Sequence, residues 1–254
     1  MNSQKTQNDV EQYKKRIQDL EQEVANYKSW HKFHRSVAHE LRIYLSPIIG
    51  YSRLLQEKTS LNETQSKYIS TLLIHGAYPL LHRINNYADF NKLLLGEIDI
   101  KSERVDVRKK LNDIVEELSL KAAEKGISIS YDIDPHIPEL IKSDDIRLNQ
   151  IFYELIENAI IQTSEGQITV TLEDSNSTLH ITVEDTGHGI SSEGREKLSK
   201  LFEGVFSKLD LRLGGLGLVI VKMLCDLMKG KVWVESQGDI GSTFHVTIPY
   251  EVSM

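Results

Sequence analysis

Apolar side chains recur at alternating steps of three and four residues over residues 10–48, and this pattern constrains the fold more than any other feature. The stripe consists of Val10, Tyr13, Ile17, Leu20, Val24, Tyr27, His31, His34, Ala38, Leu41, Leu45 and Ile48. Sustained over about five heptads, the spacing is typical of a coiled coil, because it holds one narrow seam against a partner helix. We therefore expect a coiled-coil helix over residues 1–29 and a homodimer. His31 and His34 are interpreted as polar seam residues that set the register, in preference to a metal pair or a pH switch.

Composition limits the classes of protein to consider. The chain has 254 residues, which is room for about two domains. Its net charge of −7 argues against nucleic acid as the main partner, since such proteins usually present a basic face. The single cysteine, Cys225, excludes a disulfide within the chain and fits a reducing cytosol. No apolar run approaches the roughly 20 residues of a membrane-spanning helix.

A helical hairpin is expected to follow the coiled coil. Pro47 cannot donate a backbone hydrogen bond, so the first helix should bend there. Ser60 and Glu63 have the spacing of a capping box, which predicts the start of a second helix. This helix should run to about Leu95 and end at Gly96. Two such hairpins, one from each chain of a dimer, form a four-helix bundle, and we assign it to residues 30–97.

Residues 98–254 differ in character, because strand-like alternating segments are interspersed with amphipathic helical ones. The expected strands are residues 104–106, 127–133, 167–173, 178–184, 231–235 and 242–249. The expected helices are residues 107–125, 144–162 and 216–228. This order predicts an α/β sandwich, with helices on one face of a mixed sheet. The fold class of the whole chain is therefore α+β.

One candidate site lies on the expected helix 144–162. Glu154 and Asn158 stand four residues apart, so their side chains share a face of the helix. Oxygen ligands of this kind suit Mg²⁺, which takes few protein ligands together with phosphates. An ordinary solvated helix face has the same pattern.

A second candidate follows the expected strand 178–184. Asp185 is followed by Gly187 and Gly189. A carboxylate at this place can accept a hydrogen bond from an exocyclic amine, and the glycines let the backbone approach a ring or a phosphate. An ordinary turn explains the same residues.

Glycines also open the expected helix 216–228. Gly215 and Gly217 stand at its first turn, where free N–H groups and the helix dipole favour an anion. A flexible loop is the simpler alternative. The preceding residues 191–213 are expected to form a lid, with Phe202 and Phe206 among its hydrophobic anchors.

His39 and Glu40 form the last candidate site. His39 lies one step off the heptad seam, so we expect it to be exposed on a helix whose backbone is held rigid. A neutral imidazole is a competent nucleophile near pH 7, and an adjacent carboxylate can hold the tautomer that leaves the other nitrogen free. The same dipeptide also occurs on solvated helix faces.

Six short motifs follow one another along the chain: His-Glu-Leu-Arg at 39–42, Glu-Asn-Ala at 157–159, Asp-x-Gly-x-Gly-Ile at 185–190, Leu-Phe-Glu at 201–203, Gly-Leu-Gly-Leu at 215–218 and Gly-Ser-Thr-Phe at 241–244. In this order they closely resemble the transmitter module of sensor histidine kinases, over about residues 30 to 250. The resemblance implies a dimerisation and histidine phosphotransfer domain at 30–97 and a catalytic ATP-binding domain of Bergerat type at 98–254. It also implies a response regulator receiver domain as partner and a cytoplasmic location, with this chain as the cytoplasmic part of a larger sensor.

The resemblance assigns roles to the candidate residues. In the first domain it makes His39 the phosphoacceptor and Glu40 the acid that orients and deprotonates the imidazole. In the second domain it implies ATP and Mg²⁺ as cofactors. The implied cofactor-binding residues are Glu154, Asn158 as the Mg²⁺ ligand, Asp185 as the adenine-binding acid, Gly187 and Gly189 beside it, and Gly215 and Gly217 over the phosphates.

Several positions depart from the family pattern. Ile43 and Tyr44 stand where the family usually has Thr or Asn and then Pro. Glu154 replaces the first Asn of the second motif, Ile161 a phosphate-reaching Lys, and Leu213 a Gly. These changes bear on nucleotide affinity and on phosphatase activity, which we expect to be weak.

Three functions are therefore compared. The main one is an autophosphorylating histidine kinase of a two-component system. The second is a catalytically weak module that binds nucleotide or a partner, which the missing Lys and Gly favour. The third is an ATPase switch like gyrase or Hsp90, in which an acid at the position of Glu154 is the hydrolytic base; the coiled coil and His39 argue against it.

Overall fold

The computed structural model describes residues 2–57, 62–203, 215–236, 238 and 240–252. The chain divides into two compact units, a helical one up to Tyr87 and an α/β one that begins at Ala88. The domain limits at residues 29–30 and 97–98 were inferred from sequence patterns and stay predictions. In the part of the chain that is described, no helix has both the length and the apolar character needed to cross a bilayer.

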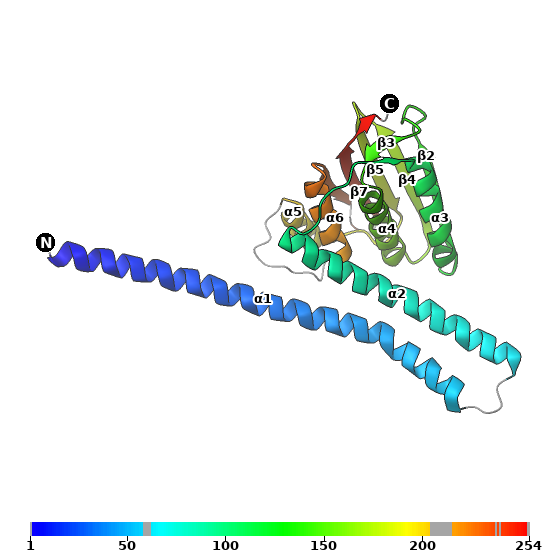
Figure 1. The fold of residues 1–254 in the computed structure, drawn as a ribbon, viewed down its shortest axis with the longest axis horizontal. Coiled ribbons are helices and arrows are strands. Elements are labelled where there is room, and N and C mark those ends of the chain that lie inside the picture. The colour runs from blue at the N-terminus through cyan, green and yellow to red at the C-terminus, as the bar shows by residue number, and fades with distance from the viewer. Residues whose placement is uncertain (1, 58–61, 204–214, 237, 239, 253–254) are drawn as a thin grey trace. The chain divides into compact units, whose positions relative to one another are not determined.

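The helical unit is an antiparallel pair. Helix α1 (Asn2–Glu57) is continuous through Pro47, and its ribbon bends in the C-terminal part (Figure 1). Helix α2 (Glu63–Leu95) is continuous through Pro79. Near the turn, Ile48 of α1 lies against Gly76 of α2, where a β-carbon would approach the Ile48 side chain to 3.0 Å. Further from the turn, the Tyr87 hydroxyl lies 2.8 Å from Nδ1 of His34. The predicted hairpin is thus present.

The cap of α2 differs from the prediction. Ser60 lies outside the described residues, and the capping box is formed two residues later by Asn62 and Gln65. The Gln65 N–H donates to Asn62 Oδ1 at 2.8 Å, and the Asn62 N–H donates to Gln65 Oε1 at 3.2 Å. Asn is as good an N-cap as Ser, so the Asn62–Gln65 pair can cap the helix in place of the predicted Ser60–Glu63 pair. At the other end Gly96 has φ +67°, as predicted for a C-terminal glycine.

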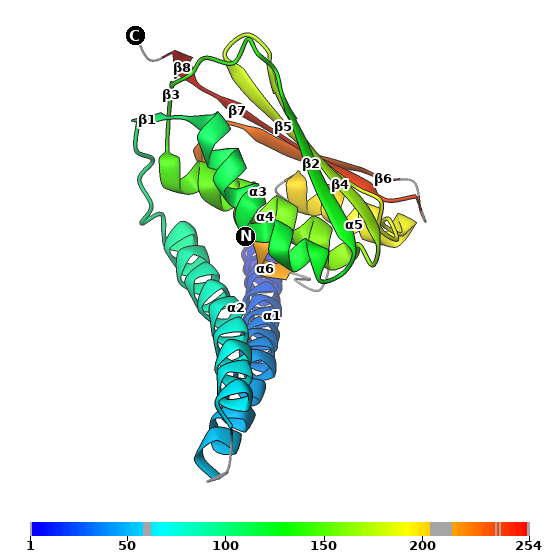
Figure 2. The same cartoon turned by 90° about the vertical axis from the view of Figure 1, so that its right-hand side faces the viewer.

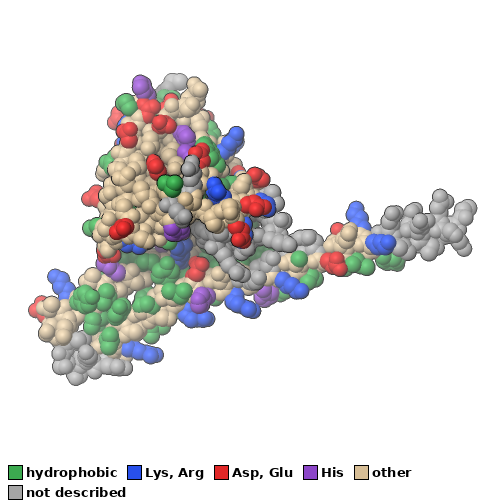
Figure 3. All heavy atoms as spheres, turned by 180° about the vertical axis from the view of Figure 1, so that it is seen from behind, with side chains coloured by type: hydrophobic (Ala, Val, Ile, Leu, Met, Phe, Trp, Pro, Cys, Tyr) green, Lys and Arg blue, Asp and Glu red, His purple; other side chains and the backbone are tan. Residues whose placement is uncertain are grey.

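The N-terminal part of the heptad stripe is exposed on the single chain. Tyr13, Ile17, Val24 and Tyr27 of α1 are each more than half exposed. Hydrophobic side chains also lie on the surface of the paired part of α1 and α2 (Figure 3). Exposed apolar surface of this extent marks an interaction site. The homodimer remains a proposal, which is taken up below.

The α/β unit contains two sheets. The larger sheet has the strand order β2-β4-β5-β7-β6, in which only β2 and β4 are parallel. Its strands are β2 (Ile127–Ile133), β4 (Gly166–Asp174), β5 (Thr178–Asp185), β6 (Lys231–Ser236) and β7 (Ser242–Pro249). The smaller sheet has the order β1-β3-β8, with β1 (Glu103–Val105), β3 (Ile141–Ser143) and β8 (Glu251–Val252). The mixed sheet was predicted, and so was β1, as residues 104–106. Strands β3 and β8 were missed, because strands of two or three residues show no period.

Helices cover one face of the large sheet (Figure 2). They are α3 (Val107–Ala123), α4 (Asp145–Gln162) and α6 (Gly215–Leu227). Alternate residues of the strands, such as Val170, Ile181 and Val246, are fully buried beneath them. The sequence therefore forms the predicted α/β sandwich, because period-two and period-3.6 apolar faces meet in one core.

Local caps set where these helices begin. Asp144 Oδ1 accepts from the Arg147 N–H at 3.0 Å at the start of α4, and Asp106 caps α3 in the same way at 2.9 Å. Ser191 caps α5 (Ser192–Phe202), a helix that occupies the first half of the expected lid. The rest of that lid, with Phe206 and Leu213, lies outside the described residues.

Candidate functional site

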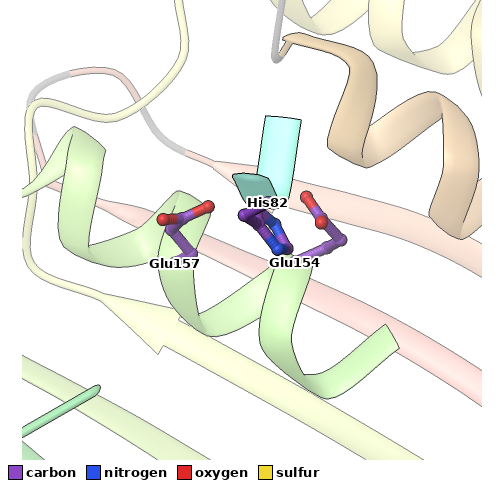
Figure 4. Close-up of side chains that lie close together, drawn as sticks. All are labelled: His82, Glu154 and Glu157. Carbon is purple, nitrogen blue, oxygen red and sulfur yellow. The ribbon is translucent and has the colours of Figure 1, made fainter. Parts of the chain in front are cut away.

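Helix α4 carries most of the predicted polar groups of the α/β unit. Glu154 and Glu157 are almost fully buried, and both carboxylates project from α4 (Figure 4). Asn158 is half-buried, one turn after Glu154. Lys121 of α3 forms an ion pair with Glu157 at 2.5 Å. The Glu157 carboxylate is therefore paired with Lys121. The candidate Mg²⁺ site remains on the helix face that carries Glu154 and Asn158.

The start of α6 packs directly on that face. A β-carbon placed on Gly217 would overlap with Oε2 of Glu154. Only glycine fits here while the Glu154 carboxylate keeps its position. The two residues were predicted as separate sites, and the fold joins them into one. Gly215 opens α6 as predicted.

Asp185 lies at the end of β5 with an exposed fraction of 2%. The Gly187 N–H donates to Asp185 Oδ1 at 2.9 Å. Oδ2 is buried and has no hydrogen-bond partner among the described residues. Burial raises the pKa of this carboxyl, and the bond from Gly187 acts in the opposite direction. A buried acceptor without a donor is costly, so it points to a ligand that donates there.

The loop after Asp185 is docked on the C-terminal end of α4. A β-carbon at Gly187 would approach the Gln162 carbonyl oxygen to 2.5 Å, so glycine is required for close approach. Gly189 has φ +65°, a left-handed conformation that also favours glycine. The His188 Nε2 lies 2.9 Å from Oε1 of Gln162. Gly187 and Gly189 therefore have structural reasons for being glycine, and their place beside a nucleotide stays a prediction.

Gly241 also contacts Asp185, and this contact was not predicted from the sequence. A β-carbon at Gly241, before β7, would overlap with the Asp185 carbonyl oxygen, and Gly241 has φ +102°. The Ser236 hydroxyl donates to the Gly241 carbonyl at 2.7 Å and accepts from the Ile190 N–H at 2.9 Å. The Gly-Ser-Thr-Phe motif at 241–244 signalled this position, and the strand register explains it.

The structure thus brings together two groups of predicted residues. In the first group Glu154 of α4 contacts Gly217. The second group consists of Asp185, Gly187 and Gly189, and it contacts α4 at Gln162. The side chain of Ile161, where the family pattern has Lys, is 46% exposed and offers no cation. Gly214 lies outside the described residues.

His39 and Glu40 belong to the helical unit. His39 is exposed on α1, as predicted, and Glu40 is half-buried. Ile43, one turn further on, is 56% exposed. His39 and position 43 are therefore both accessible, and i and i+4 share a face.

Comparison with known proteins identifies the class. Residues 143–252 match the family model described as "Histidine kinase-, DNA gyrase B-, and HSP90-like ATPase". Signal transduction histidine-protein kinase BarA of Escherichia coli K12 is 35% identical over 230 residues, which are 88% of this chain and 25% of BarA. Hybrid signal transduction histidine kinase B of Dictyostelium discoideum is 35% identical over 228 residues, which are 85% of this chain and 11% of that protein.

Comparison of the fold with solved structures also finds histidine kinases. Full-length ShkA, crystallised in complex with AMPPNP, matches with a TM-score of 0.62 and 29% identity, over 86% of this chain and 46% of ShkA. The α/β unit is thus an ATP-binding domain of the histidine kinase, gyrase B and Hsp90 family. The chain as a whole belongs to the sensor histidine kinases and corresponds to their transmitter. It spans a quarter or less of the length of the two curated relatives above.

Proposed function

We propose that this transmitter phosphorylates itself on His39 with ATP and passes the phosphoryl group to an aspartate of a response regulator receiver domain. The observation that carries the proposal is the buried, unpartnered Oδ2 of Asp185 beside two glycines that the fold requires. The family membership supplies the reaction type. Phosphoryl transfer depends mainly on positioning and charge neutralisation, so few reactive groups are needed.

The nucleotide would be held by the α/β unit. Asp185 offers its free acceptor to the exocyclic amine of adenine, and Gly187 and Gly189 allow the backbone to approach the ring. Gly215 and Gly217 stand at the first turn of α6, where N–H groups face an anion favourably. Bound ATP supplies the phosphoryl group; the chain supplies the orientation.

Mg²⁺ would be held by Asn158. Its side-chain amide makes no hydrogen bond among the described residues, so its oxygen is available as a ligand. Mg²⁺ commonly takes one or two protein oxygens and completes its shell with phosphate and water. Glu154, one turn earlier, adds negative charge to the same face.

The acceptor would be the imidazole of His39. Glu40 would accept from the N–H of one ring nitrogen and so orient the lone pair of the other toward the γ-phosphorus. As the N–P bond forms, the bond from the γ-phosphorus to the β-phosphate oxygen breaks, ADP leaves, and Glu40 takes the ring proton. The exposed heptad stripe supports a homodimer through α1 and α2, since its apolar residues need a partner helix. A kinase fragment of a larger sensor would act in the cytoplasm.

A second candidate function is ATP hydrolysis without phosphorylation of the protein. It is favoured by the contact between the Glu154 carboxylate and Gly217, because an acid at the phosphate end of the site can activate water. The nucleotide site would be the same, but His39 would have no role.

Incubation with γ-labelled ATP and Mg²⁺ separates these functions. The kinase gives acid-labile label on the protein, which is absent from His39→Ala and present in His75→Ala, a matched exposed histidine of the same unit. The ATPase releases free phosphate in both variants. A weak binding module gives neither product. Label that maps to His34 or His75 in the unsubstituted chain would contradict the role of His39.

A further inference from the structure

The outer face of the large sheet is the one opposite α3, α4 and α6 (Figure 2). Three aromatic rings form a cluster on this face. His180 projects from β5, His245 from β7 and Trp233 from β6. Trp233 stands opposite His245, and His245 stands opposite Thr182, in the strand register. His180 lies two residues before Thr182, diagonal to His245. The Trp233 and His245 rings stack with centroids 4.9 Å apart and planes at 10°.

One nitrogen of each imidazole faces the other. His180 Nε2 lies 3.3 Å from His245 Nδ1, and the Thr182 hydroxyl lies 3.4 Å from the same Nδ1. A tetrahedral zinc ion with Zn–N bonds of about 2.0–2.1 Å separates two ligand nitrogens by about 3.3–3.4 Å. The distance between the two nitrogens is therefore the one that a shared ion requires.

The other nitrogen of each ring faces a carboxylate. His180 Nδ1 lies 3.9 Å from Glu173 Oε2, and His245 Nε2 lies 3.8 Å from Glu235 Oε1. Histidines that bind metals usually direct their second N–H to a carboxylate, which fixes the tautomer and raises the basicity of the ligating nitrogen. His245 Nε2 is buried without a hydrogen-bond partner among the described residues, so a small shift of the exposed Glu235 would satisfy it.

We propose that His180 and His245 form a binding site for a transition-metal ion such as Cu²⁺ or Zn²⁺ on the outer face of the ATP-binding domain. Imidazole nitrogens suit both ions, and Cu²⁺ binds more tightly at a given set of nitrogen ligands. Two protein nitrogens, with the Thr182 hydroxyl close by, leave the remaining positions to water. The site is separate from the nucleotide residues, since Asp185 faces the helices and His180 the opposite side of β5.

The alternative is a simple hydrogen bond between the two imidazoles. In that case one ring donates, the other accepts, and no ion is needed. Burial lowers the pKa of His245, which keeps that ring neutral and its lone pair available near neutral pH. The two arrangements differ in the position of the ring protons. In the metal site each ring carries its proton on the nitrogen that faces its carboxylate, and in the hydrogen bond one of the two facing nitrogens keeps a proton.

Quenching of Trp233 fluorescence by Cu²⁺ tests the proposal. Trp30 is the second of the two tryptophans, so Trp30→Phe in the full chain leaves Trp233 as the only reporter. One equivalent of Cu²⁺ should quench Trp233 saturably. His180→Gln and His245→Gln should each raise the midpoint by about tenfold or more, the scale on which metal sites lose affinity when supporting groups are removed.

His136→Gln is the matched control. His136 is an exposed histidine of the same unit with the Asp134 carboxylate 2.7 Å away, and no contact with a second histidine is seen in the described part of the chain. Its substitution should leave the midpoint unchanged. Equal midpoints in all variants, or bound Cu²⁺ without quenching of Trp233, would overturn the proposal.

Two further measurements do not depend on quenching. Electron paramagnetic resonance of the unsubstituted chain with one equivalent of Cu²⁺ should show nitrogen ligands, which a site made of oxygens alone would not. Zn²⁺ should raise the unfolding temperature of the α/β unit in the unsubstituted chain and not in the variant with both histidines changed to Gln. An equal rise in both would assign the zinc effect to another site and contradict this one.

Discussion

Gly217 lies directly against the carboxylate of Glu154, so that a β-carbon at position 217 would overlap with Oε2 of Glu154. The contact joins the start of α6 to the middle of α4. It gives a steric reason for glycine at the second position of the Gly-Leu-Gly-Leu motif as long as the Glu154 carboxylate keeps its position. It also means that any change of Glu154 acts on the first turn of α6.

Gly217→Ala should destabilise the α/β unit by about 1–3 kcal/mol, because the added methyl group overpacks a buried position. Glu154→Ala in the same chain should recover most of this loss, since it removes the overlapping atoms. Urea unfolding followed by Trp233 fluorescence, in the Trp30→Phe background, measures both. Gly238→Ala is the control, since no heavy atom lies within 4 Å of its β-carbon. Strictly additive effects of Gly217→Ala and Glu154→Ala would show that the contact is unimportant.

Asp185→Asn should weaken ATP binding by roughly 10- to 100-fold, because the amide replaces one of the two acceptor oxygens with an NH₂ donor, which cannot accept from an exocyclic amine. The loss should be larger for ATP than for GTP, which carries no amine at the same ring position. Titration with both nucleotides checks this. Glu184→Gln changes the neighbouring exposed acid on the other face of β5 and should have little effect. Equal affinities of the Asp185→Asn and unsubstituted chains would place the nucleotide elsewhere.

As pH rises, the unsubstituted chain should lose stability relative to the Asp185→Asn variant. Burial raises the pKa of Asp185 above its ordinary value of 3.8, so the folded state favours the protonated carboxyl. Its stabilising contribution is complete below about pH 4 and is lost as pH rises through the raised pKa. The free energy of unfolding of both chains, measured from pH 4 to 7, should therefore diverge in favour of Asp185→Asn. A constant difference would mean that the pKa is not raised.

Asn158→Ala should remove the dependence of nucleotide binding on Mg²⁺. The amide oxygen of Asn158 is the proposed protein ligand, and without it the ion is held by phosphates and water alone. ATP titrations with Mg²⁺ and with excess chelator should give nearly equal affinities in the variant and different ones in the unsubstituted chain. Ile161→Ala, one turn further along α4, is a control for local packing. Retention of the full Mg²⁺ effect would exclude Asn158 as a ligand.

Ile43→Thr should increase phosphatase activity toward a phosphorylated response regulator. Position 43 shares the His39 face of α1, and Ile43 offers only methyl groups where a hydroxyl could position water. One well-placed polar group changes the rate by a factor on the order of 10²–10³. We expect Ile43→Thr to recover part of this, an increase of about tenfold in phosphatase rate. The decay of the phosphorylated regulator measures it, with Ile49→Thr, the same change at an exposed position outside the heptad stripe, as the control. Rapid decay already caused by the Ile43-containing chain would contradict the expected kinase bias.

The local elements of this protein follow from its sequence. The limits of Ile127–Ile133 and Ser242–Pro249 agree with the predicted strands, and α4 begins at the Asp144 cap. Periodicity and caps act over a few residues, so they can be interpreted without knowledge of the fold. The order of the six motifs likewise identified the family before any geometry was known.

Tertiary structure decided which of these residues meet. The contact of Gly217 with Glu154, the orphaned oxygen of Asp185 and the facing nitrogens of His180 and His245 each depend on strand register or helix packing. Residues far apart in the chain carry no local signal of such pairing, because it results from burying the shared apolar core. The sequence thus determined the elements and the chemistry available to them, and the packing of the core determined which groups act together.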